Sequence, residues 1–424
     1  MLSARQTAIY PLVVVFILTT FLSCHRVVMI SPGIKPGVEG SPLIRVRLSD
    51  GVKKVRLGGA ESDILITDAA SGEKIARLLP GVEWDAVSFG PQAQLRLAMP
   101  DGKVSKQHPA GIRLKALTEP EMIKVNGKIY RGAVYVYSDR QGGLMAVNFC
   151  PLEQYLRSVV PAEMGVLEDR YMEALKAQAV ASRSFAMAQM ARNQTFLFDV
   201  TANTDDQVYK GLANENREAD RAVLSTSGEC LIRGGKVITA FYHSTCGGRT
   251  AAPEEVWGKR FAQDNPYLES VKDEKYDQGS KWYNWEEKWT RKELLERIKK
   301  ALPSIAGLSA EDVGEPGDIE VVEKGPSGRN VLLKVTTDKR VLQISGDAIR
   351  NVLRTRDGRI LPSTFFTLSV ARESSGPVII ARGKGFGHGL GMCQTGAQSR
   401  AENGDSYTRI LKAYYKGVKV LKVY

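Results

Sequence analysis

The sequence predicts an α+β protein, with a mixed β-rich core and a few long helices around a cleft, preceded by a β-rich N-terminal segment. Short alternating runs between Gly/Asp turns fill the first part of the chain, whereas long helical runs stand isolated among later hairpins. Such segregation is typical of α+β architecture rather than of a parallel βαβ sheet. At 424 residues, the chain is long enough for about two or three compact units.

An apolar run at the start of the chain predicts export. Arg5 precedes the run 8–22, which Pro11 interrupts and which is short for a membrane span. The Leu-Ser-Cys that follows resembles a bacterial lipoprotein cleavage site, although Phe21 stands where leucine is usual. We therefore predict lipidation at Cys24, with an uncleaved membrane anchor as the alternative. Both predictions place the body outside the cytoplasm, in the periplasm or on the outer face of the cytoplasmic membrane.

Composition divides the rest of the chain. The Pro/Gly-rich segment 31–42 is typical of a tether. Ile44 and Val46 then alternate with arginines, as in a half-buried strand, and further short strands follow. The pattern predicts strands at 63–67, 95–97 and 112–117, and a hairpin of 129–137 with 143–149. We predict four parts: a signal peptide (1–24), a linker (25–42), a β-rich domain (43–135) and a core (136–424).

The charge of the chain favours an acidic partner. The formal net charge is +12, and the 25% content of charged residues is ordinary for a globular protein. Basic residues are spread along the chain and no DNA- or RNA-binding module is recognisable, so nucleic acid is not expected as a partner. An anionic wall polymer and a merely basic surface are equally compatible with this charge.

The stretch 159–190 carries the main candidate for chemistry. Pro161 and Glu163 lie in a turn-like entry to a long helical run, which also presents Lys176, Gln178 and Arg183. A carboxyl group at a helix entrance, close to basic and amide groups, is one way to build a single acid/base catalyst. In the simpler alternative, Glu163 only stabilises the helix N-terminus, by about 0.3–1 kcal/mol.

Two glycine-rich segments each carry a histidine. Residues 242–250 (YHSTCGGRT) end a β-rich run, and residues 383–394 (GKGFGHGLGMCQ) have glycine at every second position. Glycine lets the backbone approach a ligand or another chain closely. The second segment lacks GxGxxG spacing and no βαβ unit surrounds it, which argues against a dinucleotide-binding fold. His243 would also fit a packed core position or a turn.

The cysteines allow either disulfides or a metal site. Beyond Cys24 the chain has four: Cys150, Cys230, Cys246 and Cys393. In an exported protein they permit up to two disulfides in any of three connectivities. Alternatively, His243 with Cys246 and His388 with Cys393 could converge on a structural zinc ion. A Cys246–Cys393 disulfide is an equal alternative to this zinc site, and no other cofactor is expected.

Several motifs resemble those of the stage II sporulation protein D and LytB-type amidase-enhancer family. The matching elements are LEQYL (152–156), VVPAEM (159–164), EALKAQA (173–179), TDDQVYKG (204–211), YHSTCGGRT (242–250), EEVWG (254–258), GKGFGHGLGMCQ (383–394) and the C-terminal helix at 407–416. The resemblance covers nearly the whole chain from residue 41, although Cys393 stands where serine is frequent in the family.

The resemblance implies a lytic transglycosylase that cleaves MurNAc–GlcNAc strands of peptidoglycan, stripped of stem peptides, to 1,6-anhydro ends. Glu163 would be the single acid/base and would need a raised pKa, hence a partly desolvated pocket. Residues implied in substrate binding are Lys176, Gln178, Arg183, Gln207, Tyr209, Tyr242, His243, Ser244, His388 and Gln394. The alternative is a non-enzymatic glycan-binding enhancer of a cell-wall amidase, and membrane attachment would be through the N-terminal anchor.

Other residues leave two interpretations open. Trp257 and Tyr267 could stack on sugar rings or pack in a core. Tyr209 would likewise suit ordinary packing. The tryptophan-rich stretch 281–302 could form a membrane-surface helix, but its leucine and isoleucine spacing favours packing. A hairpin at 319–335 and a short helix at 344–353 are expected after it.

Overall fold

The computed structural model describes residues 40–90, 94–139, 141–374 and 376–424. The expected signal peptide, Cys24 and all of the expected linker before Gly40 lie outside the described residues. At the end of that linker, Ser41 is buried and the Pro42 carbonyl accepts a hydrogen bond from the Leu152 amide. Within the described ranges, no helix is both long and apolar enough to cross a membrane.

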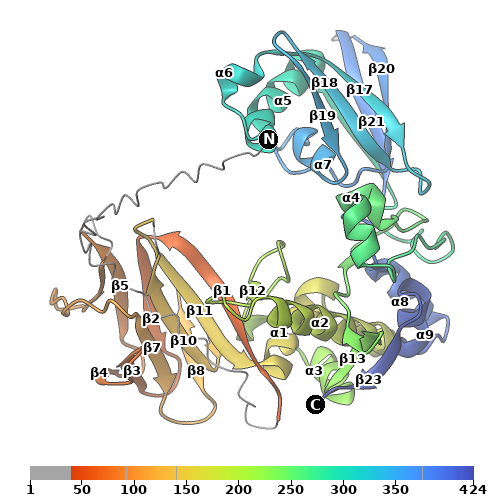
Figure 1. Cartoon of the computed structure of the whole chain (residues 1–424). Helices are drawn as coiled ribbons and strands as arrows, with labels where there is room; N and C mark the ends of the chain where they lie inside the picture. The colour runs from red at the N-terminus through yellow and green to blue at the C-terminus, as the bar shows by residue number, and fades with distance from the viewer. Residues whose placement is uncertain (1–39, 91–93, 140, 375) are drawn as a thin grey trace, which may run out of the picture.

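The first part of the structure consists of two packed layers of strands, which are antiparallel except for the parallel pair β1–β12 (Figure 1). Ile44 and Val46 are fully buried, which confirms the predicted strand, but Arg45 between them is also buried and pairs with Asp199. One layer has the order β12-β1-β11-β10-β7-β3-β4 and the other β6-β5-β2-β8-β9. The bounds are β1 (Leu43–Val52), β2 (Lys54–Gly59), β3 (Ile64–Asp68), β4 (Lys74–Leu78), β5 (Glu83–Phe89), β6 (Gln94–Ala98), β7 (Ile112–Ala116), β8 (Met122–Val125), β9 (Lys128–Arg131), β10 (Ala133–Ser138), β11 (Leu144–Pro151) and β12 (Val200–Thr201).

The expected domain boundary at 135/136 falls inside β10. Strand β11 pairs with both β1 and β10, so the predicted hairpin belongs to the β-rich part, although its expected first strand is divided: residues 128–131 form β9 in the other layer. The helical unit starts only at Leu152. It contains α1 (Leu152–Met164), α2 (Met172–Arg192), α3 (Arg217–Ser225), α8 (Gln394–Glu402) and α9 (Tyr407–Tyr414), with the small sheet β14-β13-β23 (Lys236–Val237, Glu229–Arg233, Lys419–Lys422).

The position of Glu163 in its helix differs from the prediction. Pro161 does not open the long helix but lies inside α1, so Glu163 occupies the last turn of α1. Gly165, with φ of 78°, then turns the chain towards α2. Near a helix C-terminus the macrodipole disfavours a carboxylate. The simpler alternative, in which Glu163 stabilises a helix N-terminus, is therefore wrong.

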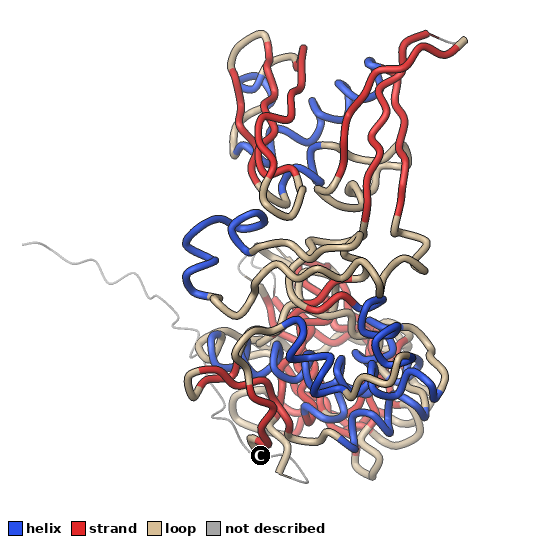
Figure 2. The backbone as a smooth tube through the Cα atoms, turned by 90° about the vertical axis from the view of Figure 1, so that its right-hand side faces the viewer, coloured by secondary structure: helices blue, strands red, loops and turns tan. Residues whose placement is uncertain are grey.

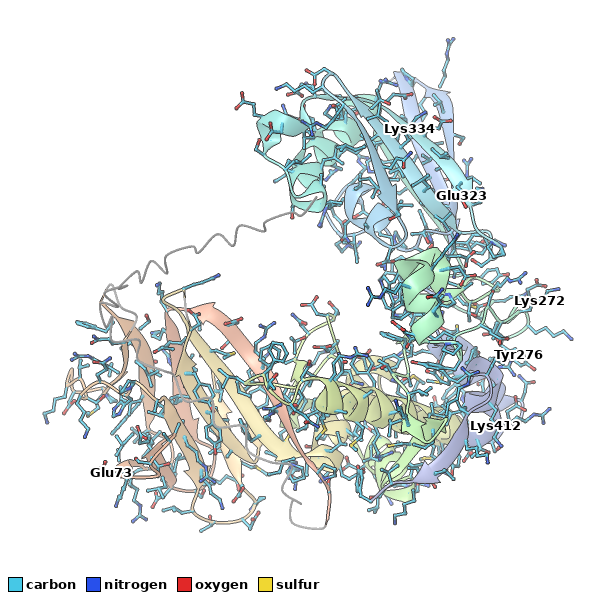
Figure 3. All side chains as sticks on the ribbon, in the orientation of Figure 1. Glu73, Lys272, Tyr276, Glu323, Lys334 and Lys412 are labelled. Carbon is cyan, nitrogen blue, oxygen red and sulfur yellow. The ribbon has the colours of Figure 1, made fainter. Side chains whose placement is uncertain are left out.

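A further α+β module is inserted in the sequence between the two parts of the helical unit, after β14 and before α8. In Figure 2 loops connect its strands to the helices below, and its surface carries exposed charged side chains such as Glu323 (Figure 3). The elements here are α4 (Pro253–Asp264), β16 (Asn284–Thr290), α5 (Arg291–Ala306), α6 (Ala310–Val313), β17 (Pro316–Lys324), β18 (Asn330–Thr337), β19 (Val341–Ser345), α7 (Ala348–Val352), β20 (Phe366–Glu373) and β21 (Gly376–Lys384).

The module has its own core, which decides between the two interpretations of the tryptophan-rich stretch. Leu294, Ile298 and Leu302 of α5 are fully buried against Trp289 and the strands. The packing interpretation is thus confirmed for this helix. The predicted hairpin at 319–335 is present as β17 and β18. The expected helix at 344–353 begins later than predicted, because residues 341–345 form β19.

Candidate active site

The Glu163 carboxyl group lies between its own helix and three segments that are distant in sequence. Its Oε1 accepts a hydrogen bond from the Val208 amide at 2.7 Å. The side chains of Gln394 and Tyr242 also hydrogen-bond to it. Burial raises the pKa of Glu163 above its usual value, and these hydrogen bonds only partly oppose that rise. Glu163 is half-buried rather than fully enclosed, and Gly165 and Val166, which follow it closely in the chain, are exposed.

A very short parallel ladder brings the two glycine-rich segments to Glu163. Strand β15 (Tyr242–His243) pairs with β22 (Met392–Cys393), so that Tyr242 faces Met392 and His243 faces Cys393. Side chains alternate between the two faces of a strand. Tyr242, and Gln394 directly after β22, therefore contact Glu163, while His243 and Cys393 lie on the opposite side of the ladder.

An amide network fixes the orientation of these groups. Gln207 is fully buried; its Nε2 donates to the Tyr242 hydroxyl at 2.9 Å, and its Oε1 accepts from Tyr155 at 3.2 Å. Gln178 is also fully buried and accepts from Gln394 at 3.4 Å. Both glutamines therefore act behind the residues that touch Glu163. Their hydrogen bonds hold Tyr242 and Gln394 in place.

Close backbone contact explains the glycine at position 391. Gly391 has φ of 69°, and a Cβ there would lie 2.0 Å from the Phe241 carbonyl oxygen. That carbonyl accepts a hydrogen bond from the Met392 amide, next to the β15–β22 ladder. Only a residue without a side chain allows this approach.

We expect Gly391→Ala to destabilise the protein by more than the left-handed backbone alone would cost, about 1–2 kcal/mol. The matched control is Gly234→Ala, because Gly234 also has positive φ (56°) but no atom lies within 4 Å of the place that a Cβ would take. The measurement is the urea unfolding midpoint of both variants. Equal losses of stability in the two variants would show that the short distance to the Phe241 carbonyl adds no cost.

His388 lies in an aromatic cluster rather than beside Glu163. Its ring is 5.4 Å from Trp257 and 6.2 Å from Phe241. Burial lowers the pKa of His388 to about 4, and burial also lowers the pKa of His243, so both rings are neutral at pH 7. Trp257 remains 42% exposed, whereas Tyr267 is 5% exposed. Of the two aromatic residues with alternative interpretations, Tyr267 is a core residue and Trp257 offers an exposed ring.

Three residues expected in substrate binding are engaged elsewhere. Arg183 is fully buried and pairs with Glu153 at 2.7 Å. The Tyr209 hydroxyl points to Asn148 at 2.9 Å, and its ring is buried. Lys176 pairs with Glu173 at 2.7 Å. The polar groups of Arg183 and Tyr209 are enclosed and already bonded in this structure.

Comparison with known proteins identifies the family. The family model described as "Stage II sporulation protein" matches residues 140–232, and a model for a domain of unknown function matches residues 259–391. Stage II sporulation protein D of Bacillus amyloliquefaciens is 31% identical over 290 residues, which cover 65% of this chain and 75% of that protein. The chain belongs to the stage II sporulation protein D family.

Two other relatives of this SpoIID chain extend the comparison. An uncharacterized protein of Brachyspira hyodysenteriae is 33% identical over 300 residues, covering 70% of this chain and 73% of that protein. The amidase enhancer of Bacillus subtilis is 31% identical over 344 residues, covering 70% of this chain but only 44% of the enhancer. The match to the sporulation family model ends at residue 232, so β15, β22 and the module lie outside that match.

The SpoIID site also contains residues that the sequence does not single out. The Val208 amide is a backbone donor and has no signature in the sequence. Tyr155 lies within the LEQYL motif, but nothing there indicates that its hydroxyl reaches Gln207 at 3.2 Å. Arg329, on the β17–β18 hairpin loop, donates to the Cys246 carbonyl at 2.8 Å. Such a contact spans 83 positions and follows only from the three-dimensional fold.

Proposed function

We propose that this SpoIID protein is a peptidoglycan lytic transglycosylase in which Glu163 is the single acid/base. The observation that carries the proposal is the setting of Glu163: a carboxyl group with a raised pKa, partly exposed, and held by Tyr242 and Gln394 from the two glycine-rich segments. A general acid needs its proton at working pH, and burial shifts the pKa of Glu163 in that direction. The names of the sporulation and amidase-enhancer relatives support a role at the cell wall.

One carboxyl group is enough for this reaction because no water is consumed. Protonated Glu163 would donate its proton to the glycosidic oxygen as the C1–O bond breaks. The resulting carboxylate would take the proton of the C6 hydroxyl of N-acetylmuramic acid as O6 bonds to C1. The products are a free 4-hydroxyl end and a 1,6-anhydro end, and Glu163 is again protonated. Ordinary glycosidases need a second carboxylate for water or a covalent intermediate.

The residues around Glu163 have distinct roles in this scheme. The Val208 amide and the Tyr242 hydroxyl would stabilise the carboxylate formed after the first proton transfer, since hydrogen bonds to a charged acceptor are the stronger kind. Trp257 and His388 would offer ring faces to a sugar. Ser244, in the 242–250 segment, would offer its hydroxyl group. The glycan strand would be extracytoplasmic, and membrane attachment through Cys24 belongs to the same proposal.

The deciding experiment incubates the purified protein alone with glycan strands stripped of stem peptides. We expect 1,6-anhydro products by mass spectrometry. A parallel sample with intact peptidoglycan tests whether peptide removal is required. Product-free incubation of the correctly folded protein under both conditions would contradict the proposal.

The second candidate is a binding module that enhances an amidase, as the name of the Bacillus subtilis relative indicates for that protein. It predicts no product from glycan alone and faster release of stem peptides when an N-acetylmuramoyl-L-alanine amidase is added. The two arms of the experiment therefore separate catalysis from recruitment. Glu163→Gln would leave such enhancement intact.

A further inference from the structure

A group of soft ligand atoms lies behind the Glu163 site. His243, Cys246 and Cys393 each offer one ligand atom, and these atoms all lie within 4.8 Å of one another in a fully buried location. They come from segments 147 residues apart in sequence. A compact set of two thiols and one imidazole is typical of the ligands that tetrahedral zinc prefers.

The histidine in this group has an unused nitrogen. His243 Nδ1 lies 3.0 Å from the Leu390 carbonyl oxygen, which fixes Nδ1 as the protonated nitrogen. The other nitrogen, Nε2, is buried and lacks a hydrogen-bond partner. A buried polar atom without a partner is costly, and it is the lone pair that a metal uses when the second ring nitrogen donates to a carbonyl. The unpartnered Nε2 is a second observation that supports a metal site, separate from the short distances among the three ligand atoms.

The two sulfur atoms have different surroundings: Cys393 Sγ accepts hydrogen bonds from amides, whereas Cys246 Sγ donates to a carboxylate. The Cys393 Sγ accepts from the amides of Cys246 and Gly396, each at 3.3 Å, at the N-terminus of α8. Cys246 Sγ lies 3.0 Å from Asp277 Oδ2, while Asp277 Oδ1 is buried without a partner.

We propose that His243, Cys246 and Cys393 bind one zinc ion, leaving a fourth position for water or for a carboxylate that moves. Binding would release the thiol protons of Cys246 and Cys393 to solvent, so that two thiolates neutralise the charge of Zn²⁺. His388, expected as the fourth ligand, is engaged differently: its Nδ1 accepts from the Leu390 amide at 3.0 Å. Arg329, fully buried nearby, would balance Asp277.

The zinc would cross-link the two segments that hold the Glu163 carboxyl group. Its ligands His243 and Cys393 face each other across β15 and β22, a ladder of only two residue pairs. Their neighbours Tyr242 and Gln394 hold the Glu163 carboxyl group. This positional role rests on the proposed function, whereas the metal site itself does not.

Metal content tests the site directly. The protein is purified under reducing conditions with zinc in the medium and analysed for metals. We expect about one zinc per chain, falling to near zero in His243→Ala, Cys246→Ser and Cys393→Ser. Cys150→Ala and Cys230→Ala are the matched controls, because both thiols are also buried and free but lie outside the group. Glu163→Gln should keep its zinc, which separates this outcome from a failure of the proposed catalysis.

A second measurement keeps the proposal testable if the ligand variants fail to fold. Wild-type protein loaded with Co²⁺ should show thiolate-to-cobalt charge transfer and the visible bands of a tetrahedral site. Alkylation after denaturation without reductant should label Cys246 and Cys393. Absence of metal together with loss of both thiol hydrogens in the intact mass would show a Cys246–Cys393 disulfide and overturn the zinc site.

Discussion

Replacing Glu163 by glutamine is expected to lower the release of 1,6-anhydro products by roughly 10²–10⁴-fold, the usual contribution of one positioned general acid/base. Glutamine has nearly the same shape as glutamate, and its carbonyl oxygen can still accept from the Val208 amide, which lies 2.7 Å from the carboxyl oxygen. It has no proton to transfer to a glycosidic oxygen. The measurement is the initial rate of product formation from denuded glycan, by mass spectrometry.

The control for this variant is its stability as a function of pH. Burial raises the folded-state pKa of Glu163 above 4.5, so folding is favoured by its protonated form and this contribution is lost as pH rises through the folded pKa. Glutamine mimics the protonated form at every pH. We therefore expect equal stability of the two proteins below about pH 4.5 and greater stability of Glu163→Gln above the folded pKa.

The two outcomes together define the role of the carboxyl group. A folded, more stable and inactive variant has lost chemistry, not structure. An inactive variant that is also unstable at neutral pH would contradict the raised pKa. Activity that persists in a stable variant would remove Glu163 from the reaction and leave the amidase-enhancing role as the better explanation.

The candidate site can be predicted from sequence where motifs are local. Glu163, Tyr242 and Gln394 each lie in a short motif, and the structure brings these three side chains together. The position of Glu163 within its helix is harder to predict. Proline is common in the first turn of a helix, so Pro161 indicates a helix start. In the structure it lies near the C-terminal end of α1, where its missing N–H costs the helix one hydrogen bond to the preceding turn, and Gly165 ends the helix.

Long-range contacts explain most of what the sequence does not predict. The module between α4 and β21 interrupts the helical unit, yet its strands look like any other hairpins in the sequence. Arg329 reaches from this module to the Cys246 carbonyl across 83 positions. Arg183 and Lys176 both lie on α2 as basic residues, and periodicity alone does not show which one is enclosed.

Arg183 is the site of the second large expected effect. Arg183→Met should destabilise the protein by about 3–5 kcal/mol, because it leaves the Glu153 carboxylate without its buried partner. The Arg183 side chain is 0% exposed and Glu153 is 16% exposed. The guanidinium also donates to the Val223 and Glu229 carbonyls at 3.3 and 3.2 Å, so helix α1, helix α3 and β13 all lose a common contact. The free energy of unfolding in urea measures this loss.

Lys176→Met is the matched control for Arg183→Met. Lys176 is on the same helix, but its side chain is 25% exposed and its partner Glu173 is 33% exposed. A pair of this kind contributes about 0–1 kcal/mol. If Arg183 were a ligand-binding residue, both variants would remain equally stable and differ only in glycan affinity. A large loss of stability in Arg183→Met alone would instead assign Arg183 to holding α1, which carries Glu163, against α2 and α3.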